Sequence, residues 1–280
     1  MSRSTLLIGG CGYIGSALYC TLAEDYDVSV WDTEVRGNPG HIPHLENDFT
    51  EGWGYIQEAD DIILLAAHSS VATAEADPFN AFWNNIVGFY DVLRGLRSDQ
   101  RLIYASTSSI YSGFGSDLVS EDGPRGNMYD FTKYADDCLA MMSDKNVWGL
   151  RFGTVNGPSP NTRWDLMLNK MCKDAEETGL VTITSPEVHR PILGINDLCR
   201  AVQAILNGTG RPGIYNLASF NSSVLTLGRA VSRDFGCPLQ FGPNSPTYDF
   251  AISSRKFQKE YSFTFQETAG SIIQELREVL

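Results

Sequence analysis

A glycine-rich turn near the N-terminus constrains the fold of this chain more than any other feature. The stretch LLIGGCGYIGSAL covers residues 6–18, and its glycines follow an apolar run and precede a helical pattern. Between a strand and a helix, such a turn lets the backbone approach a pyrophosphate, and the helix N-terminus supplies free N–H groups. The glycines allow two spacings, Gly10-x-Gly12-x-x-Gly15 and Gly9-x-x-Gly12-x-x-Gly15. The stretch therefore predicts a dinucleotide site, while the spacing that matters and the chemistry stay open.

The rest of the chain alternates short apolar runs with longer amphipathic ones. Several of the short runs are apolar on both faces, as in a buried parallel sheet. The predicted strands are Thr5–Ile8, Asp27–Trp31, Ile62–Ala66, Arg101–Ala105, Val147–Phe152 and Gly213–Leu217, with helices such as Ile14–Leu22 and Phe79–Leu96 between them. This alternation predicts an α/β fold, a Rossmann-type doubly wound parallel sheet with a smaller, irregular C-terminal substrate lobe.

The pattern changes after Phe152. The run Asn156-Gly-Pro-Ser-Pro160 is a turn-rich break, and further prolines interrupt the remaining chain. We expect residues 1–153, with about 191–217, to form the dinucleotide-binding domain. Residues from about 154 to 190 and from 218 to 280 would form the substrate-binding lobe.

The helical stretch Phe79–Leu96 has more apolar surface than one packed face requires. One stripe is predicted at Phe79, Phe82, Ile86, Phe89, Leu93 and Leu96, and a second at Trp83, Val87 and Tyr90. One stripe can face the sheet, and the second also needs cover. We expect a homodimer contact there, with packing under a loop as the alternative.

Composition narrows the class of protein and its partners. The chain of 280 residues carries a net charge of −13, with 42% hydrophobic and 20% charged residues, ordinary values for a soluble globular protein. The negative charge disfavours nucleic acid or an anionic membrane as a partner. The six cysteines are scattered without a C-x-x-C pair, which predicts reduced thiols in a cytoplasmic protein. No segment approaches the length of a membrane span or has the form of a targeting sequence.

Asp32 supports the dinucleotide prediction. It ends the second predicted strand, in DVSVWD, where a carboxylate would accept hydrogen bonds from the adenosine ribose hydroxyls. A carboxylate there also repels a 2′-phosphate, so we expect NAD rather than NADP. Asp48, in Asn47-Asp-Phe49, is either a turn residue or a contact to the adenine amino group.

A candidate acid–base group lies in the middle of the chain. Tyr129 and Lys133 occur in MYDFTKYADD at i and i+4 and share a helix face. They follow a strand that ends in hydroxyl side chains, at residues 106–109. A nearby ammonium group and the positive charge of a nicotinamide would favour the Tyr129 phenolate, which could act as a base.

In this order, the glycine turn, the strand-end hydroxyls and Y-x-x-x-K resemble the extended short-chain dehydrogenase/reductases, and within them the NAD-dependent nucleotide-sugar epimerase/dehydratase family. The similarity is carried by the segments GGCGYIGS, LLAAHSSV, Asn85-Ile-Val-Gly88, STSSIYSG, LRFGTVNGPSP and HRPILGINDL. It selects Gly9, Gly12 and Gly15 as the loop glycines. Thr154 and Asn156 depart from the residues usual in the family, which leaves the sugar and the nucleotide open.

The resemblance implies roles for particular residues. The catalytic residues would be Thr107, Tyr129 and Lys133. The NAD-binding residues would be Gly9, Gly12, Tyr13, Ile14, Gly15, Asp32, Asp48, Phe49, Ala66, Ala67, His68, Tyr129, Lys133 and Phe152. The residues that bind a nucleotide-diphosphate sugar would be Thr107, Ser108, Tyr129, Thr154, Arg163 and Arg190. Arg163 could equally be a surface arginine. We expect no metal site, because no further ligands group with His41 and His44 in the sequence.

Among the family's reactions, the resemblance favours a 4-epimerase that oxidises a sugar carbon to a ketone and returns the hydride to the other face. A 4,6-dehydratase carries an Asp-Glu pair directly after the catalytic threonine, where this chain has Ser108 and Ser109. Two hydroxyls cannot replace two carboxyls at neutral pH. The alternatives are a 4-ketoreductase or dehydrogenase and, less favoured, an NAD-binding sensor or scaffold without catalysis.

Overall fold

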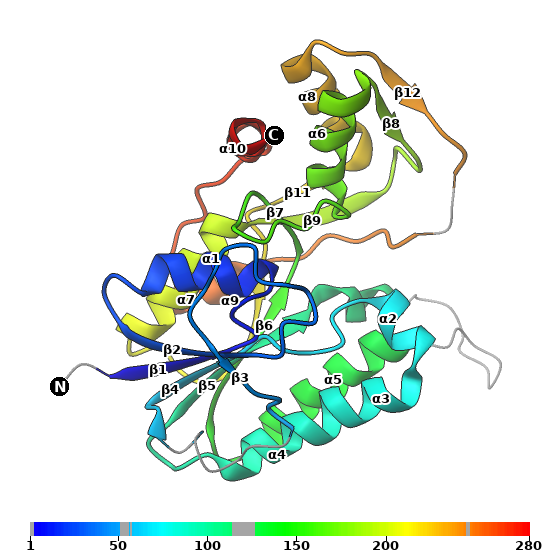
Figure 1. The fold of residues 1–280 in the computed structure, drawn as a ribbon. Coiled ribbons are helices and arrows are strands. Elements are labelled where there is room, and N and C mark those ends of the chain that lie inside the picture. Colours follow the sequence, from blue (N-terminus) through cyan, green and yellow to red (C-terminus); the bar gives the residue numbers. More distant parts are fainter. Residues whose placement is uncertain (1–2, 51–55, 57, 114–126, 245–246) are drawn as a thin grey trace, which may run out of the picture.

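A seven-stranded parallel sheet forms the larger part of the computed structural model, which describes residues 3–50, 56, 58–113, 127–244 and 247–280. The strand order is β10-β6-β5-β4-β1-β2-β3 (Figure 1). The strands are β1 (Ser4–Ile8), β2 (Asp27–Asp32), β3 (Leu45–Glu46), β4 (Asp61–Leu64), β5 (Arg101–Thr107), β6 (Asn146–Phe152) and β10 (Gly213–Leu217). The six predicted strands are confirmed to within two residues at either end, and the short β3 was not predicted.

Helices cover both faces of this sheet, as expected for a doubly wound fold (Figure 1). One face packs against α1 (Tyr13–Leu22), α7 (Ile195–Asn207) and α9 (Arg255–Tyr261), and the other against α4 (Gly88–Gly95) and α5 (Met128–Met142). Alternate residues of β1 enter the two cores, since Leu7 packs on one face while Leu6 and Ile8 pack on the other. The predicted α/β class is confirmed.

The predicted helix Phe79–Leu96 is a succession of three segments. Helix α2 (Val71–Ala76) precedes α3 (Pro78–Phe82), a π-helical turn at Trp83–Val87, and α4. A π turn contains an additional residue, which rotates the following stripe relative to the preceding one. Phe89 and Leu93 are therefore buried, whereas Phe79 is 88% exposed and Phe82 is 43% exposed. The prediction of one continuous stripe from residue 79 to residue 96 was wrong for this reason.

A second lobe is built from smaller sheets. One contains β7 (Thr154–Asn156), β9 (His189–Gly194) and β11 (Phe220–Ser223), and another pairs β8 (Val181–Ile183) with β12 (Leu239–Phe241). Their core includes side chains of α6 (Met167–Thr178), α8 (Val224–Phe235) and α10 (Ala269–Val279). The predicted boundaries of the two lobes stay a prediction.

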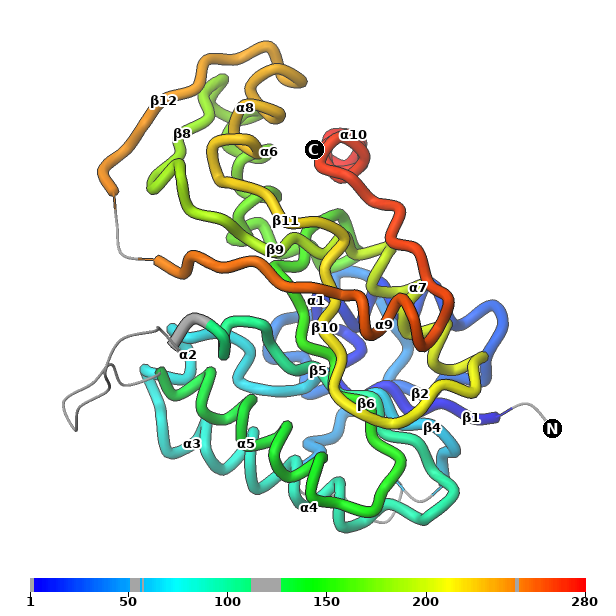
Figure 2. Tube along the Cα trace, turned by 180° about the vertical axis from the view of Figure 1, so that it is seen from behind, coloured from blue at the N-terminus to red at the C-terminus, as the bar shows by residue number. Residues whose placement is uncertain are grey.

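The chain crosses between the two lobes several times. After β12, the segment from residue 247 to α9 runs back beside β9 and β11 towards the large sheet (Figure 2). The Phe250 N–H donates to the carbonyl of His189, and the Asn221 side chain bonds to both backbone groups of Ile252. Residues late in the sequence are thereby placed beside the carboxyl edge of the large sheet.

Across the described part of the chain, no helix has the length and apolar character needed to cross a membrane.

Candidate active site at the carboxyl edge of the large sheet

The strand order reverses between β1 and β4, and the crevice outside the carboxyl ends of strands at such a point is where α/β sheets bind ligands. The Gly9–Gly15 turn lies there, between β1 and α1. Gly9 has a φ of +88°, and a Cβ on it would lie 2.7 Å from the Ala66 backbone nitrogen. A Cβ on Gly15 would lie 2.1 Å from the Gly9 carbonyl oxygen. Both glycines are therefore required by the packing of the turn itself.

Gly12 differs from its neighbours. A Cβ there would meet only the Gly9 carbonyl oxygen, at an ordinary 3.5 Å. Gly12 is also the N-cap of α1, which has no side-chain cap. The N-terminal N–H groups of α1 and the space above Gly12 fit the pyrophosphate of a dinucleotide.

Asp32 ends β2 and holds the turn in place. One carboxylate oxygen accepts the Cys11 N–H at 2.8 Å, and the other accepts the Glu34 N–H at 2.8 Å. A carboxylate has about four acceptor positions, so two remain for ribose hydroxyls. The arrangement fits the predicted role of Asp32 in binding NAD.

Asp48 caps a local turn, since its Oδ1 accepts from the Thr50 N–H at 2.9 Å and from the Thr50 hydroxyl at 2.7 Å. The side chain of Phe49 is buried, and a Cβ on Gly88 would lie 2.8 Å from its ring. These contacts are structural, and the predicted contact of Asp48 with adenine stays a prediction.

The loop after β4 is held by Asn85, which was recognised in a family motif but not predicted as a site residue. The Asn85 Oδ1 accepts the His68 N–H at 2.8 Å, and its Nδ2 donates to the His68 carbonyl at 3.3 Å and to the Thr132 hydroxyl at 3.0 Å. Asn85 is 3% exposed and lies in the π-helical turn. It therefore joins the loop of Ala66, Ala67 and His68 to the helix that carries Tyr129 and Lys133.

Helix α5 is fixed against the sheet by a buried carboxylate. Asp137 accepts hydrogen bonds from Tyr104 at 2.6 Å and Ser106 at 3.1 Å, and from the Arg151 guanidinium at 2.7 Å. Removing any one partner would leave a buried polar group unsatisfied. This network sets the position of Tyr129 and Lys133 relative to the end of β5.

Thr107, the last residue of β5, is a side-chain hydrogen-bond partner of Tyr129. Thr107 is also directly opposite Phe152, the last residue of β6, in the sheet register. The sequence-predicted Thr107 and Tyr129 are thus brought together at the carboxyl edge.

The pKa of Tyr129 is raised to about 12 in this chain. Burial of the phenol is the largest cause, the charges of Asp130 and Asp136 add to it, and Thr107 opposes it. The expectation that Lys133 would lower this pKa is not met by the chain alone. Lys133 Nζ lies 3.4 Å from Asp136 Oδ2, and this neighbouring carboxylate offsets the ammonium charge.

Asp136 is a buried carboxyl that the sequence reasoning missed. Its pKa is raised to about 7, mainly by burial and against the attraction of Lys133. Its Oδ1 has no hydrogen-bond partner in the described part of the chain. It titrates near neutral pH beside a predicted catalytic residue.

Asp130 is a second carboxylate that sequence reasoning did not single out. Ser108 and Ser109 begin a short 3-10 helix after β5, and the Ser109 hydroxyl donates to Asp130 Oδ1. Ser109 Oγ also lies 2.8 Å from Thr107 Oγ1. The hydroxyls that follow Thr107 are therefore joined to a carboxylate, supplied by α5 rather than by their own segment. The position of Asp130 directly after Tyr129 in the sequence is the signal that could have identified this carboxylate.

The predicted sugar-side residues lie on the second lobe and its connections. Arg190 stacks on the Tyr248 ring, with its guanidinium carbon 5.5 Å from the ring centre, and donates to the Thr247 hydroxyl. Burial lowers the pKa of Arg190. Arg163 pairs with Asp165, while its charge lowers the pKa of Tyr129.

Thr154 and Asn156 belong to β7. Thr154 is half-buried and lies opposite Ile192 of β9. Asn156 is fully buried, and its Oδ1 accepts the Leu168 N–H at 3.0 Å. Asn156 therefore positions the start of α6.

The loop after β7 closes over the glycine-rich turn. The Tyr13 hydroxyl donates to the Gly157 carbonyl at 2.8 Å, and Asn161 Nδ2 donates to the Cys11 carbonyl at 2.9 Å. Burial raises the pKa of the Tyr13 phenol. The predicted cofactor residue Tyr13 thus connects the two lobes through its hydroxyl.

His44 has neighbours that its sequence position did not indicate. Its Nε2 lies 3.3 Å from Glu34 Oε1, and the Cys11 thiol completes a group whose ligand atoms lie within 4.8 Å of one another. The reason given from sequence for expecting no metal, that nothing groups with the histidines, was wrong for His44. Burial and the nearby charge of Asp32 raise the pKa of Cys11 to about 12, which keeps the thiol neutral.

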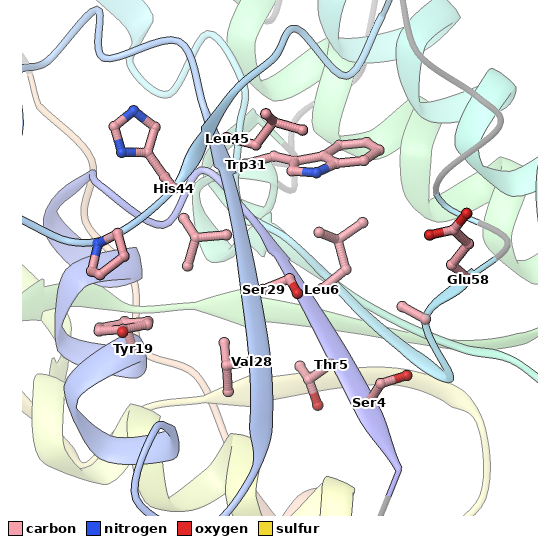
Figure 3. A pocket seen from close by; sticks show the side chains of 13 residues that line it. Ser4, Thr5, Leu6, Tyr19, Val28, Ser29, Trp31, His44, Leu45 and Glu58 are labelled. Carbon is pink, nitrogen blue, oxygen red and sulfur yellow. The ribbon is translucent and has the colours of Figure 1, made fainter.

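A cavity of about 450 Å³ lies away from the carboxyl edge, along the part of β2 that β3 does not pair with (Figure 3). Thr5, Val28, Ser29 and His44 are among the side chains that line it. The Gly9–Gly15 turn and the Thr107–Tyr129 pair are not part of this lining. The glycine-rich turn and the candidate acid–base residues therefore lie outside this cavity.

Comparison with known proteins agrees with this geometry. The family model for the NAD dependent epimerase/dehydratase family matches residues 5–218. The protein CapI of Staphylococcus aureus is 28% identical over 237 residues, which cover 74% of this chain and 70% of that protein.

Among solved structures, the UDP-glucuronic acid 4-epimerase of Bacillus cereus has a TM-score of 0.84 at 20% identity, covering 99% of this chain and 100% of that one. A dTDP-glucose 4,6-dehydratase of Bacillus anthracis has a TM-score of 0.81 at 18% identity, covering 99% and 96%. These two structures share the fold of this chain.

Proposed function

This chain belongs to the NAD-dependent epimerase/dehydratase family, and from that premise we propose that it is a nucleotide-sugar 4-epimerase. NAD is the cofactor of the family. The observation that carries the proposal is the pairing of Thr107 with Tyr129 at the carboxyl edge, with Lys133 on the same helix. The residues that directly follow Thr107 are serines rather than the carboxyls that dehydration of the sugar requires.

When bound, NAD supplies the hydride acceptor and then the hydride donor. Tyr129, as the phenolate, would take the proton of the C4 hydroxyl as that sugar carbon is oxidised to a ketone. When the ketone is reduced again from its opposite face, Tyr129 would give the proton back to the oxygen. The oxidation and the later reduction of the sugar cancel over one cycle, so the cofactor ends in the oxidation state in which it began.

The other candidate residues position the substrate and the cofactor and stabilise the Tyr129 phenolate. Thr107 contributes a hydroxyl that can bond to the same oxygen atoms as Tyr129, and Lys133 holds the nicotinamide ribose. The positive charge of the bound cofactor would bring the pKa of Tyr129 below its present value. Catalysis then rests on orientation and proton transfer.

The sugar nucleotide is expected to lie between the two lobes. Arg190 is a cation from β9, and it would leave the Tyr248 ring to bind the diphosphate. Arg163 contributes positive charge near Tyr129, and Thr154 would contact the sugar. Related proteins named for UDP-glucose, UDP-arabinose and dTDP-glucose substrates support the class of ligand and leave its identity open.

The proposal is tested by incubating the purified protein with a panel of UDP, dTDP, GDP and CDP sugars without added cofactor, and following the sugars by NMR. Mass spectrometry identifies the released cofactor. Interconversion of two 4-epimers without net oxidation supports the proposal. The Tyr129→Phe variant should lose this interconversion. Turnover only with added NADH or NADPH would instead establish the 4-ketoreductase, and loss of water from the sugar would establish a dehydratase.

We also propose that the protein is a homodimer. Helices α3 and α5 lie side by side with the π-helical turn, in contact with one another (Figure 1). Exposed aromatic and methionine side chains lie on these elements and on α4, namely Phe79, Phe82, Trp83, Tyr90, Phe131, Tyr134, Met141 and Met142. A second copy of the same face would cover this surface by twofold symmetry. The cytoplasmic location stays a prediction.

A further inference from the structure

Tyr248 lies between the two ends of the expected sugar site. It belongs to the segment that returns from the second lobe beside β9 (Figure 2). On one side, the guanidinium carbon of Arg190 lies 5.5 Å from the centre of the Tyr248 ring. On the other side, the Tyr248 hydroxyl donates to Asp130 Oδ2 at 3.2 Å, and Asp130 adjoins Tyr129 on α5. One side chain therefore reaches from the cation expected to bind the diphosphate to the neighbour of the predicted base.

The hydroxyl of Tyr248 is held by the start of α5. Asn127 Nδ2 donates to this hydroxyl at 2.6 Å, while Asn127 Oδ1 accepts the Asp130 N–H at 2.8 Å as the N-cap of the helix. Burial and the charge of Asp130 raise the pKa of Tyr248 to about 12, so the phenol keeps the proton that it donates. Because its only proton is committed and one acceptor position is filled, the hydroxyl holds the ring in place. The part of Tyr248 that remains for recognition is the face of its ring.

Arg190 covers this ring face in the structure. It stacks on the Tyr248 ring and donates to the Thr247 hydroxyl, and neither contact places the guanidinium against a carboxylate. A diphosphate would offer Arg190 charge-assisted, bidentate hydrogen bonds, which are stronger than bonds to neutral groups. When Arg190 turns to a diphosphate, it uncovers one face of the Tyr248 ring.

The chemistry of a hexose fits an aromatic face at this point. A sugar held by its diphosphate at Arg190, with its C4 hydroxyl at Tyr129, would pass beside Tyr248. A pyranose ring carries C–H groups on its faces, and an aromatic ring packs on apolar groups without directional bonds. Buried polar groups would instead require particular sugar hydroxyls as partners. A contact without directional bonds suits 4-epimerisation, because the sugar must present both of its faces for oxidation and reduction.

We propose that Tyr248 is a substrate-binding residue that packs its ring on the sugar, which takes the place of the Arg190 guanidinium when Arg190 binds the diphosphate. Asn127 and Asp130 hold the ring beside Tyr129 through the Tyr248 hydroxyl. The inference rests on the proposed function, since it requires a nucleotide-diphosphate sugar in this site. Tyr248 was not among the substrate-binding residues predicted from the sequence.

The test compares the affinity for UDP, dTDP, GDP and CDP with the affinity for the glucose derivative of each, by calorimetry. All proteins are loaded with NAD and carry Tyr129→Phe, so the sugar is not converted during the measurement. Tyr248→Leu removes the aromatic face, whereas the matched control Tyr248→Phe keeps it and loses the hydroxyl. In Tyr248→Leu, the affinity for the sugar nucleotide should fall about three- to tenfold more than the affinity for the nucleoside diphosphate. In Tyr248→Phe, this difference should stay below about twofold.

Nuclear Overhauser effects between the Tyr248 ring and the C–H protons of the bound sugar report the contact directly, and Tyr248→Leu should remove them. Equal losses for the two kinds of ligand in Tyr248→Leu would overturn the role of Tyr248 and leave the proposed function standing. The same difference in Tyr248→Phe as in Tyr248→Leu would overturn packing on the ring. If none of the four sugar nucleotides binds before Tyr248 is changed, the proposed function fails together with this inference.

Discussion

The Asn85 carboxamide bonds to both backbone groups of His68, accepting at 2.8 Å and donating at 3.3 Å, and so fixes the loop after β4. Its Nδ2 also reaches Thr132, between Tyr129 and Lys133. One buried side chain therefore couples a predicted cofactor loop to the predicted catalytic helix.

Replacing Asn85 by Ala should lower the free energy of unfolding by about 2–4 kcal/mol, because the buried backbone groups of His68 lose their partners. NAD affinity should fall as well. Urea unfolding and NAD titration measure the two effects. Asn84→Ala is the matched control, since Asn84 Oδ1 has no partner among the described residues and should cost less than about 1 kcal/mol. Equal losses in both variants would contradict the role given to Asn85.

Two glycines of the turn should respond differently to alanine. Gly15→Ala places a Cβ 2.1 Å from the Gly9 carbonyl oxygen, so we expect a loss of about 2–4 kcal/mol in unfolding free energy. In Gly12→Ala the new Cβ lies 3.5 Å from the Gly9 carbonyl oxygen, so the free energy of unfolding should fall by about 1 kcal/mol or less. It should nevertheless weaken NAD binding at least about tenfold, because the methyl group fills the expected position of the pyrophosphate. If Gly12→Ala bound NAD as the wild type does, the pyrophosphate could not lie there.

Activity should rise with pH through the neutral range. The pKa of Tyr129 is raised to about 12, so the phenol keeps its proton at neutral pH and the basic form increases about tenfold per pH unit below the pKa. Bound NAD should move this dependence to lower pH. The pH profile of kcat/KM measures the dependence of the rate. NMR titration of the protein labelled with ¹³Cζ-tyrosine, with and without NAD, measures the shift in the pKa of Tyr129. A rate that falls between pH 6 and pH 8 would argue against Tyr129 as the base.

The Asp136 carboxyl should make the folded protein less stable as pH rises. Its pKa is raised from 3.8 to about 7, so the native state holds a proton that the unfolded state has released. Its stabilising contribution is complete below about pH 4 and is lost as pH rises through about 7. Relative to wild type, Asp136→Asn should therefore gain about 1 kcal/mol or more between pH 4 and pH 8, measured by urea unfolding. A difference independent of pH would show that Asp136 does not titrate in this range.

The proposed dimer should dissociate when its apolar face is charged. Phe131 is 52% exposed on α5, so Phe131→Asp should leave the fold intact and produce a monomer at micromolar concentration. Phe241→Asp, at a residue 58% exposed on β12, is the control and should stay dimeric. Sedimentation velocity measures both, and a monomeric wild type would exclude the dimer.

Local patterns were sufficient for much of this protein. Apolar runs buried on both faces predict the parallel strands, because each strand's periodicity is a property of a few consecutive residues. The glycine turn and the Tyr129–Lys133 spacing are equally local. The glycine turn by itself left two spacings open, and the family resemblance selected Gly9, Gly12 and Gly15. In the structure, Gly9, Gly10 and Gly15 are crowded, while Gly12 is not.

Tertiary structure decided what depends on residues far apart in the chain. The π turn changed which aromatic residues of the helix 79–96 are buried, because one additional residue in a turn rotates all later side chains. Tyr248 reaches Asp130 only because the chain returns from the second lobe. Asp136 and Asp130 alter the charge around Lys133 and Tyr129 only once burial removes water. The sequence determined the elements and predicted the acid–base residues, whereas the burial and charge around those residues, and with them the pKa values, were decided by long-range packing.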